Sequence, residues 1–261
     1  MSLTGNNILG GASGQTTGYD IDQSLRFEDG DSAYLSRTPS SAGNRKTWTW
    51  SGWLKKGNDV TGQLFNVGTG SSDSTYTTIG WHTSGYFYVG PYSPASWRST
   101  SALYRDPASW YNLCVVLDTT QASASNRVKM YVNGEQITDF STSNDPAQDA
   151  EFAINNNIQH NIGSENGSGN YFDGYLAEVN FIDGQALTPA SFGETNSDTN
   201  QWVPTKYAGS YGSNGFYLKF QDSSALGDDS SGNTNDFTAT NLAATDQVLD
   251  SPTNNFATLN P

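Results

Sequence analysis

The sequence predicts an all-β protein built as a two-sheet sandwich or a barrel, and three observations support this. Short runs of alternating polarity, rich in aromatic and β-branched residues, recur along the chain between Gly, Asn, Asp and Pro residues. No stretch shows the 3.6-residue periodicity of a long helix. The runs follow no fixed repeat length, which argues against a propeller or a solenoid. About a dozen short, evenly spaced strands are typical of a sandwich or a barrel.

The composition supports a folded core. The chain has 261 residues, enough for one large all-β domain. Hydrophobic residues are only 34% of it, but 7 Trp, 14 Tyr and 12 Phe make that fraction bulky. A few large rings per strand can fill a core that smaller side chains would leave open. We therefore expect a folded protein and not a disordered one.

The charge balance excludes two classes of partner. The chain carries 12 basic and 26 acidic residues, a formal net charge of −14. Its paired basic residues are Arg45-Lys46 and Lys55-Lys56, too few for a phosphate-binding surface. No apolar run approaches the ~20 residues that a membrane span needs. Neither nucleic acid binding nor membrane insertion is expected.

Residues 1–20 predict a flexible arm. They are rich in Gly, Ser, Thr and Asn, and Ile8-Leu9 is their one apolar contact point. Such a segment buries little surface by itself, so we expect it to attach the chain to a partner. It has neither the basic start nor the hydrophobic stretch of a secretory signal, which predicts synthesis in a cytoplasm.

The strands of the predicted sandwich lie within residues 21–220. In chain order the runs are "SLRFEDGDSAYLSR", "TWTWSGWLKK", "GQLFNVG", "TYTTIGW", "GYFYVGPY", "WYNLCVVLDTT", "NRVKMYVNGEQI", "HNIGSENG", "YLAEVNFIDG" and "FYLKFQD". The Asn133-Gly134 pair within the seventh run predicts a tight hairpin. Helix is expected only as a turn or two in "LTPASFGE" and "DPAQDAEF". Residues 221–261 predict a loop-rich strap packed on the sandwich.

The run "YLAEVNFIDG" shows how the faces of a strand are assigned. Tyr175, Ala177, Val179 and Phe181 fall on one side, while Glu178 and Asn180 fall on the other. A sandwich strand shows one face to the core and one to solvent. Glu178 and Asn180 are therefore expected on the solvent side.

No catalytic motif stands out, and the protein is not expected to be an enzyme. The sequence contains no GxSxG, P-loop, GxGxxG or HExxH. Cys114 lies in an apolar run, which predicts a buried thiol and not a nucleophile. Acid pairs of the kind used in glycoside hydrolysis do occur. They lie beside Gly, Pro or Asn, where acids usually shape turns: Asp29 and Asp31, Asp145 and Asp149, Glu178 and Asp183.

The stretch "DDSSGNTND", residues 228–236, could hold a metal ion. Asp228, Asp229 and Asn233 offer side-chain oxygens, which hard cations such as calcium prefer. The spacing is not that of an EF-hand, and an Asx-rich turn explains the same composition. Calcium is thus a candidate ligand, and no cofactor is required.

Exposed aromatic residues provide the candidate binding site. In "IGWHTSGYFYVGPYSPASWRS" strand alternation puts Tyr86 and Tyr88 on one face, opposite Phe87. Flat rings with polar neighbours can stack on sugar rings, so the span predicts a glycan site; the alternative is that these rings fill the sandwich edge. The candidate residues are Trp81, Tyr86, Tyr88, Tyr92 and Trp97.

The runs from residue 24 to 192 resemble a known family. "WYNLCVVLDTT", "NRVKMYVNGEQI" and "IGSENGSGNYFDGYLAEVNFIDGQALTPASF" resemble the concanavalin A-like, laminin-G-like jelly roll, in order as well as in content. The resemblance implies a two-sheet antiparallel jelly-roll sandwich. Glucanases that share the fold carry a Glu-x-Asp-x-x-Glu strand, and this sequence has no such spacing.

A narrower resemblance concerns the rest of the chain. "SLRFEDGDSAYLSRTPSSAGNRKTWTWSGWLKKG", "QWVPTKYAGSYGSNGFYLKFQD", "DDSSGNTNDFT" and "DSPTNNFATLNP" look like segments of virion proteins from tailed bacteriophages, marine ones especially. This implies a virion surface protein, a fibre or appendage subunit that binds host-surface or environmental glycans. A structural capsid decoration or head-fibre protein is the alternative, and a glycan hydrolase a more distant one. The implied partners are other virion proteins, held through the N-terminal arm, and further copies of the chain, with a trimer favoured.

Overall fold

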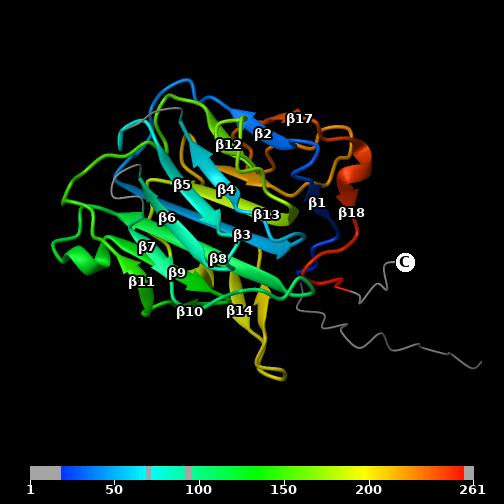
Figure 1. Cartoon of the computed structure of the whole chain (residues 1–261), viewed down its shortest axis with the longest axis horizontal. Helices are drawn as coiled ribbons and strands as arrows, with labels where there is room; N and C mark the ends of the chain where they lie inside the picture. The colour runs from blue at the N-terminus through cyan, green and yellow to red at the C-terminus, as the bar shows by residue number, and fades with distance from the viewer. Residues whose placement is uncertain (1–18, 69–71, 92–95, 256–261) are drawn as a thin grey trace, which may run out of the picture.

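Two antiparallel sheets pack face to face in the computed structural model, which describes residues 19–68, 72–91 and 96–255 (Figure 1). This confirms the predicted all-β sandwich. Tyr92 and the arm residues Ile8 and Leu9 lie outside the described residues. Within the described ranges, no helix is long and apolar enough to cross a membrane.

The first sheet is organised around the three long strands β3, β8 and β13. In spatial order its strands are β10 (Glu135–Gln136), β9 (Val128–Val132), β8 (Trp110–Asp118), β3 (Thr47–Lys56), β13 (Gly174–Asp183), β1 (Ser24–Phe27) and β18 (Gln247–Val248), with β16 (Phe216–Leu218) also paired to β13. Asn133 and Gly134, with φ of 50° and 80°, form the turn between β9 and β10. Two successive positive φ values match the hairpin turn that this residue pair predicts.

The second sheet covers one face of the first. Its strands, in spatial order, are β11 (Phe140–Ser143), β7 (Arg98–Thr100), β6 (Phe87–Pro91), β5 (Thr77–Trp81), β4 (Gly62–Val67), β12 (His160–Ile162), β2 (Tyr34–Arg37) and β17 (Thr238–Thr240). Helix in the described residues is limited to three short 3₁₀ turns, η1 (Ala124–Asn126), η2 (Pro189–Ser191) and η3 (Ala244–Asp246). The turn η2 lies in "LTPASFGE", as predicted, whereas "DPAQDAEF" forms no helix.

Aromatic side chains fill the space between the sheets. Trp48 and Trp50 of β3 are fully buried there. The Phe65 ring lies 5.7 Å from that of Phe181 and 5.9 Å from that of Phe216, measured between centroids. These are distances at which tilted aromatic pairs are favourable. The rings therefore supply the core that the low fraction of aliphatic residues could not.

The C-terminal segment does more than strap the sandwich. Strand β17 pairs with β2 at the edge of the second sheet, and β18 pairs with β1 at the edge of the first. Both strands lie beyond residue 220, where the sequence predicted the sandwich to end. Residues 221–255 thus contribute an edge strand to each sheet.

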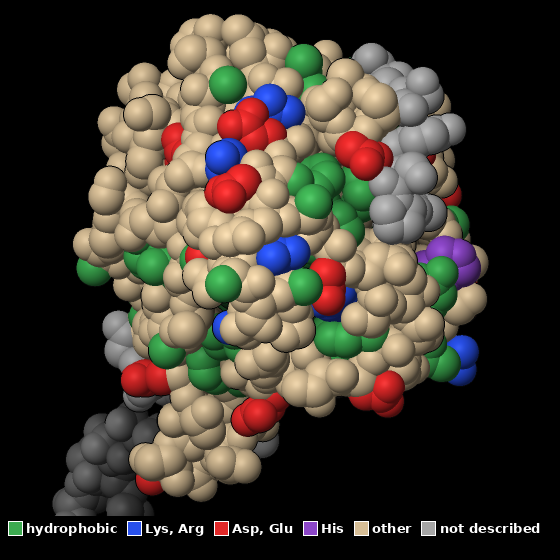
Figure 2. Space-filling model, turned by 90° about the vertical axis from the view of Figure 1, so that its left-hand side faces the viewer, with side chains coloured by type: hydrophobic (Ala, Val, Ile, Leu, Met, Phe, Trp, Pro, Cys, Tyr) green, Lys and Arg blue, Asp and Glu red, His purple; other side chains and the backbone are tan. Residues whose placement is uncertain are grey.

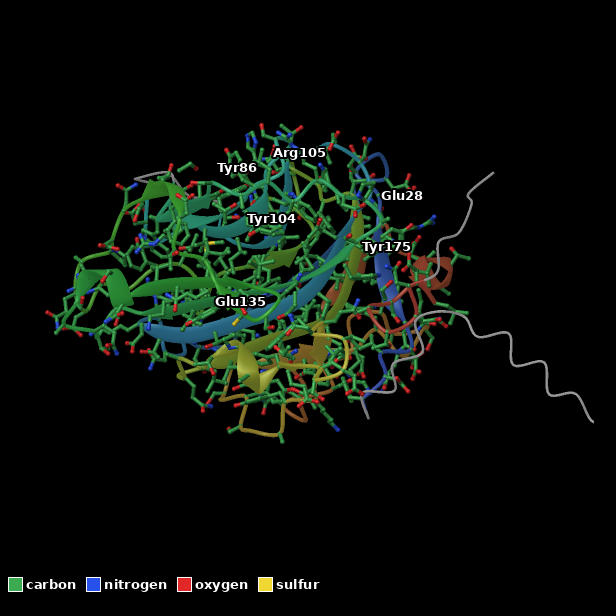
Figure 3. All side chains as sticks on the ribbon, turned by 90° about the horizontal axis from the view of Figure 1, so that it is seen from below. Glu28, Tyr86, Tyr104, Arg105, Glu135 and Tyr175 are labelled. Atoms are coloured by element: carbon green, nitrogen blue, oxygen red, sulfur yellow. The ribbon has the colours of Figure 1, made fainter. Side chains whose placement is uncertain are left out.

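A third layer covers the outer face of the first sheet, the face turned away from the second sheet. It contains the ribbon β14 (Gly193–Thr195) and β15 (Trp202–Pro204), and Figure 3 shows these segments beneath the sheet. The prediction that Glu178 and Asn180 face solvent is therefore wrong, since they are only 7% and 5% exposed. Alternation is also interrupted by a register shift between Ala177 and Asn180, so Tyr175 and Ala177 pack on the outer face, while Val179 and Phe181 face the core as predicted. Nor could alternation show that another part of the chain covers the outer face.

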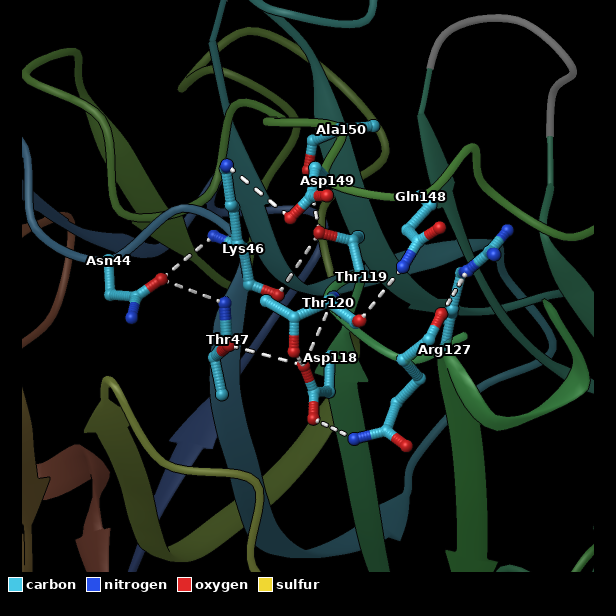
Figure 4. Close-up of polar contacts among 11 residues, drawn as sticks. Asn44, Lys46, Thr47, Asp118, Thr119, Thr120, Arg127, Gln148, Asp149 and Ala150 are labelled. Carbon is cyan, nitrogen blue, oxygen red and sulfur yellow. Dashed lines mark hydrogen bonds and ion pairs between the residues drawn. The ribbon is translucent and has the colours of Figure 1, made fainter. Parts of the chain in front are cut away.

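The end of the sandwich formed by residues 118–150 is tied together by its own polar groups (Figure 4). The Asp118 carboxylate accepts hydrogen bonds from Thr120 Oγ1 and Gln121 Nε2, both at 2.6 Å. Arg127 donates to backbone carbonyls, and Lys46 Nζ lies 3.6 Å from Asp149 Oδ1. In Figure 2 acidic and basic side chains are intermixed on this end of the molecule. These basic residues are thus engaged within the chain and form no separate cationic patch there.

Candidate functional site

Two of the predicted glycan-binding tryptophans are core residues. Trp81 and Trp97 are each 1% exposed. The Trp81 ring lies 4.9 Å from that of Phe87, and the Trp97 ring meets Phe152 edge-on at 4.5 Å. A ring enclosed in this way cannot stack on a sugar. The prediction for these two residues is therefore wrong, and the alternative that such rings fill the sandwich holds for them.

The two tyrosines of the same span have the predicted orientation. Phe87 is buried, and Tyr86 and Tyr88 lie on the opposite face, both half-buried. The Tyr86 ring stacks on His82 with 4.4 Å between centroids, and Figure 3 shows Tyr86 on the outside of the second sheet. Burial raises the pKa of the Tyr88 hydroxyl to about 12. A role for Tyr86, Tyr88 and Tyr92 in binding glycans stays a prediction.

The outer face of the first sheet holds a pocket of about 580 Å³, here called the tryptophan pocket. Three indoles line it, from β3, β8 and β15. Its volume and its mixture of aromatic and polar side chains are typical of small-molecule sites. The lining residues are Trp53, Ser109, Trp110, Asn133, Glu135, Thr195, Asn200, Gln201, Trp202, Val203, Pro204, Pro252, Thr253 and Asn255.

Strand alternation explains why Trp53 and Trp110 face this pocket and not the core. Trp48 and Trp50 point inward from β3, so a residue three positions after Trp50 points outward. In β8 the core residues include Leu113, so Trp110 points the other way. The register places Trp53 opposite Asn112 and Lys55 opposite Trp110, which brings the two indoles onto adjacent strands.

Trp202 connects the ribbon to the sheet. Its Nε1 donates a hydrogen bond to Asn112 Oδ1 at 3.2 Å. Its ring lies against Gly134 and Gly193, where an added Cβ would come within 2.4 Å and 2.5 Å of ring atoms. Only glycine allows such an approach without displacement of the ring. The two glycines therefore determine where this wall of the pocket lies.

Asp250 fixes a second wall, which the C-terminal segment provides. Its carboxylate accepts a hydrogen bond from Trp110 Nε1 at 3.0 Å and forms an ion pair with Lys55 Nζ at 2.7 Å. Lys55 Nζ also donates to Asn255 Oδ1 at 3.1 Å. Beside them, Ile21 N donates to Thr253 Oγ1 at 2.8 Å. These bonds hold residues 250–255 against β8 and the start of the sandwich.

Four polar side chains of the pocket have unused hydrogen-bonding capacity. Glu135, Thr195, Asn200 and Gln201 are exposed, and none forms a side-chain hydrogen bond or ion pair with the described residues. Together they present carboxylate, hydroxyl and amide groups beside the indoles. This arrangement suits a ligand that has both apolar faces and many hydroxyl groups.

Glu178 lies under the third layer, in a buried polar cluster next to the pocket. It occupies a bulge in β13 with φ of 51°, where the pairing with β3 shifts register. Its carboxylate accepts hydrogen bonds from Tyr19 Oη, at 2.7 Å, and from Tyr217 Oη. Burial raises the pKa of the Glu178 carboxyl above its ordinary value, although the two tyrosine donors oppose this. The ionised Glu178 carboxylate is thus less favourable in the folded protein than in water.

Replacement of Glu178 by glutamine is expected to change how stability depends on pH. Because the pKa of Glu178 is higher in the folded state, its contribution is fully present below the ordinary value of 4.5 and is lost as the pH rises through the raised value. The free energy of unfolding of Glu178→Gln, relative to that of the wild type, should therefore be higher at about pH 7 than at about pH 4. Urea unfolding at both pH values measures this, with exposed Glu194→Gln as the control. A stability difference independent of pH would contradict it.

The predicted calcium residues form a hydrogen-bonded turn. Asp229 accepts hydrogen bonds from Tyr217 N at 2.8 Å, from Ser231 N at 2.9 Å and from Asn235 N at 2.9 Å. The side-chain amide of Asn233 donates to backbone carbonyls, while Asp228 is exposed. Among the described residues, no three His, Cys, Asp or Glu side chains gather to ligate a metal. Hydrogen bonds within the chain thus occupy the Asp229 carboxylate, as in an Asx-rich turn, and a bound calcium ion stays a prediction.

Four of the predicted acids are engaged by other groups of the chain: Glu178, Asp183, Asp145 and Asp149. Asp183 accepts hydrogen bonds from Asn44 N at 2.8 Å and Asn214 N at 3.1 Å, which joins three segments of the chain. Elsewhere, burial and the neighbouring Asp29 raise the pKa of Asp173 to about 6. Cys114 is buried, and burial raises the pKa of its thiol, so it is no nucleophile. That the protein is not an enzyme stays a prediction.

Comparisons with known proteins bear on the fold. The family model described as the concanavalin A-like lectin/glucanases superfamily matches residues 29–191. A candidate carbohydrate-binding protein from Bacteroides ovatus has a similar structure, with a TM-score of 0.53 and 14% sequence identity. The similarity covers 86% of this chain and 61% of that protein, and at this identity it bears on the fold alone. No curated protein gave a match.

Two further solved structures show weaker similarity. The heptameric SAP-like pentraxin from Limulus polyphemus has a TM-score of 0.46 and 19% identity, over 65% of this chain and 80% of that one. Domains LG4-5 of the mouse laminin α1 chain have a TM-score of 0.42 and 13% identity, over 73% of this chain and 46% of that one.

Proposed function

Because this chain belongs to the concanavalin A-like lectin/glucanase superfamily, we propose that it is a lectin-like protein that binds carbohydrate in the tryptophan pocket. The observation that carries the proposal is the meeting of three indoles and four unengaged polar side chains in one pocket. The partly exposed Trp202 indole can contact the CH groups of a sugar ring above the buried Trp53 and Trp110, while amides and hydroxyls exchange hydrogen bonds with its hydroxyls. The similar Bacteroides ovatus structure, described as a candidate carbohydrate-binding protein, agrees with this proposal.

The biological setting rests on the resemblance of four sequence segments to virion proteins of tailed bacteriophages. The protein would act on the virion surface as a fibre or appendage subunit and bind glycans of the host surface. Residues 1–20 would attach it to other virion proteins, and several copies, most simply a trimer, would act together. Multivalent display raises the avidity of individually weak sugar sites.

A structural role is the second candidate, and the burial of two indoles favours it. Trp53 and Trp110 are only 5% and 8% exposed, and Trp202 joins the ribbon to the sheet. The same rings would then stabilise the third layer of a capsid decoration or head-fibre subunit, without a sugar ligand. The two roles differ in what happens when only the unengaged polar side chains are removed.

Removal of Thr195 and Gln201 side chains tests the proposal. The Thr195→Ala, Gln201→Ala double variant should weaken glycan binding by about tenfold. Its melting temperature should stay within about a degree or two of the wild type, because both residues are exposed and unengaged. Gln136→Ala is the matched control, since Gln136 is exposed on β10 and does not line the pocket.

A glycan array probed with the labelled full chain, followed by calorimetric titration of the glycans that bind, provides the measurement. Loss of affinity in the double variant but not in the control supports binding in the tryptophan pocket. Binding that is unchanged in the double variant would place the sugar elsewhere. A chain that binds no glycan on the array would support the structural role.

A further inference from the structure

We infer that the tryptophan pocket selects uncharged, hydroxyl-rich glycans and rejects acidic ones, with Glu135 as the residue that sets this preference. The inference rests on the carbohydrate binding proposed above. Its basis is the charge of the pocket wall, which is independent of the indoles that suggest a sugar site. It identifies the chemical class of the ligand and a specificity-determining residue.

Among the residues that the structure describes, the wall of the pocket carries one ionisable group, and it is negative. None of its fourteen lining residues is Lys, Arg or His, and Glu135 is the acidic residue among them. Glu135 lies on β10, directly after the Asn133-Gly134 turn, and lines the pocket together with residues of the ribbon; it is labelled in Figure 3. Its carboxylate has no partner among the described residues, so its charge is uncompensated there.

A basic side chain behind the wall, that of Lys55, is already occupied. Lys55 Nζ is bonded to the Asp250 carboxylate and to Asn255 Oδ1, and its side chain is only 12% exposed. Lys206 follows Pro204 by two positions and is exposed, but it does not line the pocket. A bound anion would thus find no free cation in the described part of the wall.

Two electrostatic effects would weaken the binding of an acidic sugar in this pocket. Its carboxylate or sulfate would lose water without a positive partner in return. It would also approach the like charge of Glu135 on a protein whose net charge is −14. Both effects weaken binding, and the long-range part also slows association at low salt.

A neutral sugar has the opposite relation to the same wall. Its hydroxyl groups can donate to the Glu135 carboxylate, and hydrogen bonds to a charged acceptor are stronger than neutral ones. The side-chain amides of Asn200 and Gln201 both donate and accept, so they suit hydroxyl groups in either role. Uncharged ligands therefore use every polar group that the pocket leaves unengaged.

Charge-altering variants of Glu135 test the inference. The probes are uncharged hexose oligosaccharides, and oligosaccharides of the same length that contain uronic acid or sulfate groups. The wild-type chain should bind the neutral set, and Glu135→Gln should weaken that binding by about tenfold. Glu135→Lys should raise the affinity for the acidic set by about tenfold. Glu194→Lys is the matched control, because Glu194 is exposed on β14 and does not line the pocket.

The outcomes separate this inference from the proposed function. Wild-type binding of acidic oligosaccharides as tight as or tighter than that of neutral ones would overturn the charge selection and leave carbohydrate binding intact. Equal gains in Glu135→Lys and Glu194→Lys would also overturn it, because net charge alone would explain them. Binding of neither set would refute carbohydrate binding itself. The melting temperatures of Glu135→Gln, Glu135→Lys and Glu194→Lys should match that of the wild type, which would show that each variant keeps the fold.

Discussion

Replacement of Trp97 by alanine is expected to lower the free energy of unfolding by about 3–5 kcal/mol. The ring is 1% exposed and packs edge-on against Phe152, so its loss leaves a cavity that the surrounding sheets can fill only in part. The backbone N–H of Trp97, directly before β7, also donates a hydrogen bond to Val89 O at 2.8 Å. Urea unfolding followed by tryptophan fluorescence and by circular dichroism gives the change in stability.

Tyr86→Ala is the control for Trp97→Ala. Tyr86 is half-buried on the outer surface, where its ring stacks on that of His82. Its removal should therefore lower the free energy of unfolding by about 1 kcal/mol or less. Equal losses in the two variants would contradict the assignment of Trp97 to the core. So would a Trp97→Ala protein of normal stability that no longer binds glycans.

Replacement of Asp250 by alanine is expected to lower the free energy of unfolding by about 2–3 kcal/mol. The change leaves the ammonium group of Lys55 without its anionic partner and the Trp110 indole without its acceptor. The figure is below that for a fully buried ion pair because the Asp250 side chain is 28% exposed. Glycan affinity should fall as well, since Trp110 and residues 252–255 would lose their fixed positions.

Asp250→Asn provides a graded comparison. Its amide oxygen can still accept from Trp110 Nε1, but the ion pair with Lys55 is lost. Its stability should therefore lie between those of the wild type and Asp250→Ala, measured by the same urea unfolding. An Asp250→Ala protein as stable as the wild type would show that the C-terminal wall needs no such anchor.

Local sequence patterns predicted the strands well because each strand obeys a local rule. Alternation in residues 85–92 correctly buried Phe87 and turned Tyr86 and Tyr88 outward. The Asn133-Gly134 pair predicted its hairpin because the turn needs two residues with positive φ. The same alternation rule, applied to Trp48, Trp50 and Trp53, would have placed the third ring on the outer face.

The tryptophan pocket could not be predicted in the same way because its walls come from distant parts of the chain. Trp202 and Asp250 approach Trp110 only after the ribbon and the C-terminal segment fold over the sheet. Likewise, alternation could not reveal the bulge at Glu178, which moves Tyr175 and Ala177 to the face opposite Val179 and Phe181. The burial of Glu178 depends on Tyr19 and Tyr217. What covers a face is a property of the tertiary structure, and no short window of sequence contains it.

The pairing of β17 with β2 and of β18 with β1 has a consequence for how the protein folds as it is synthesised. Until residues 238–248 leave the ribosome, β1 and β2 form exposed sheet edges, which are templates for pairing with other chains. Contacts between segments more than 200 residues apart also make the search for the native state slow. The sandwich should therefore close only after nearly the whole of this chain has been translated, and incomplete chains should be the species most prone to aggregate.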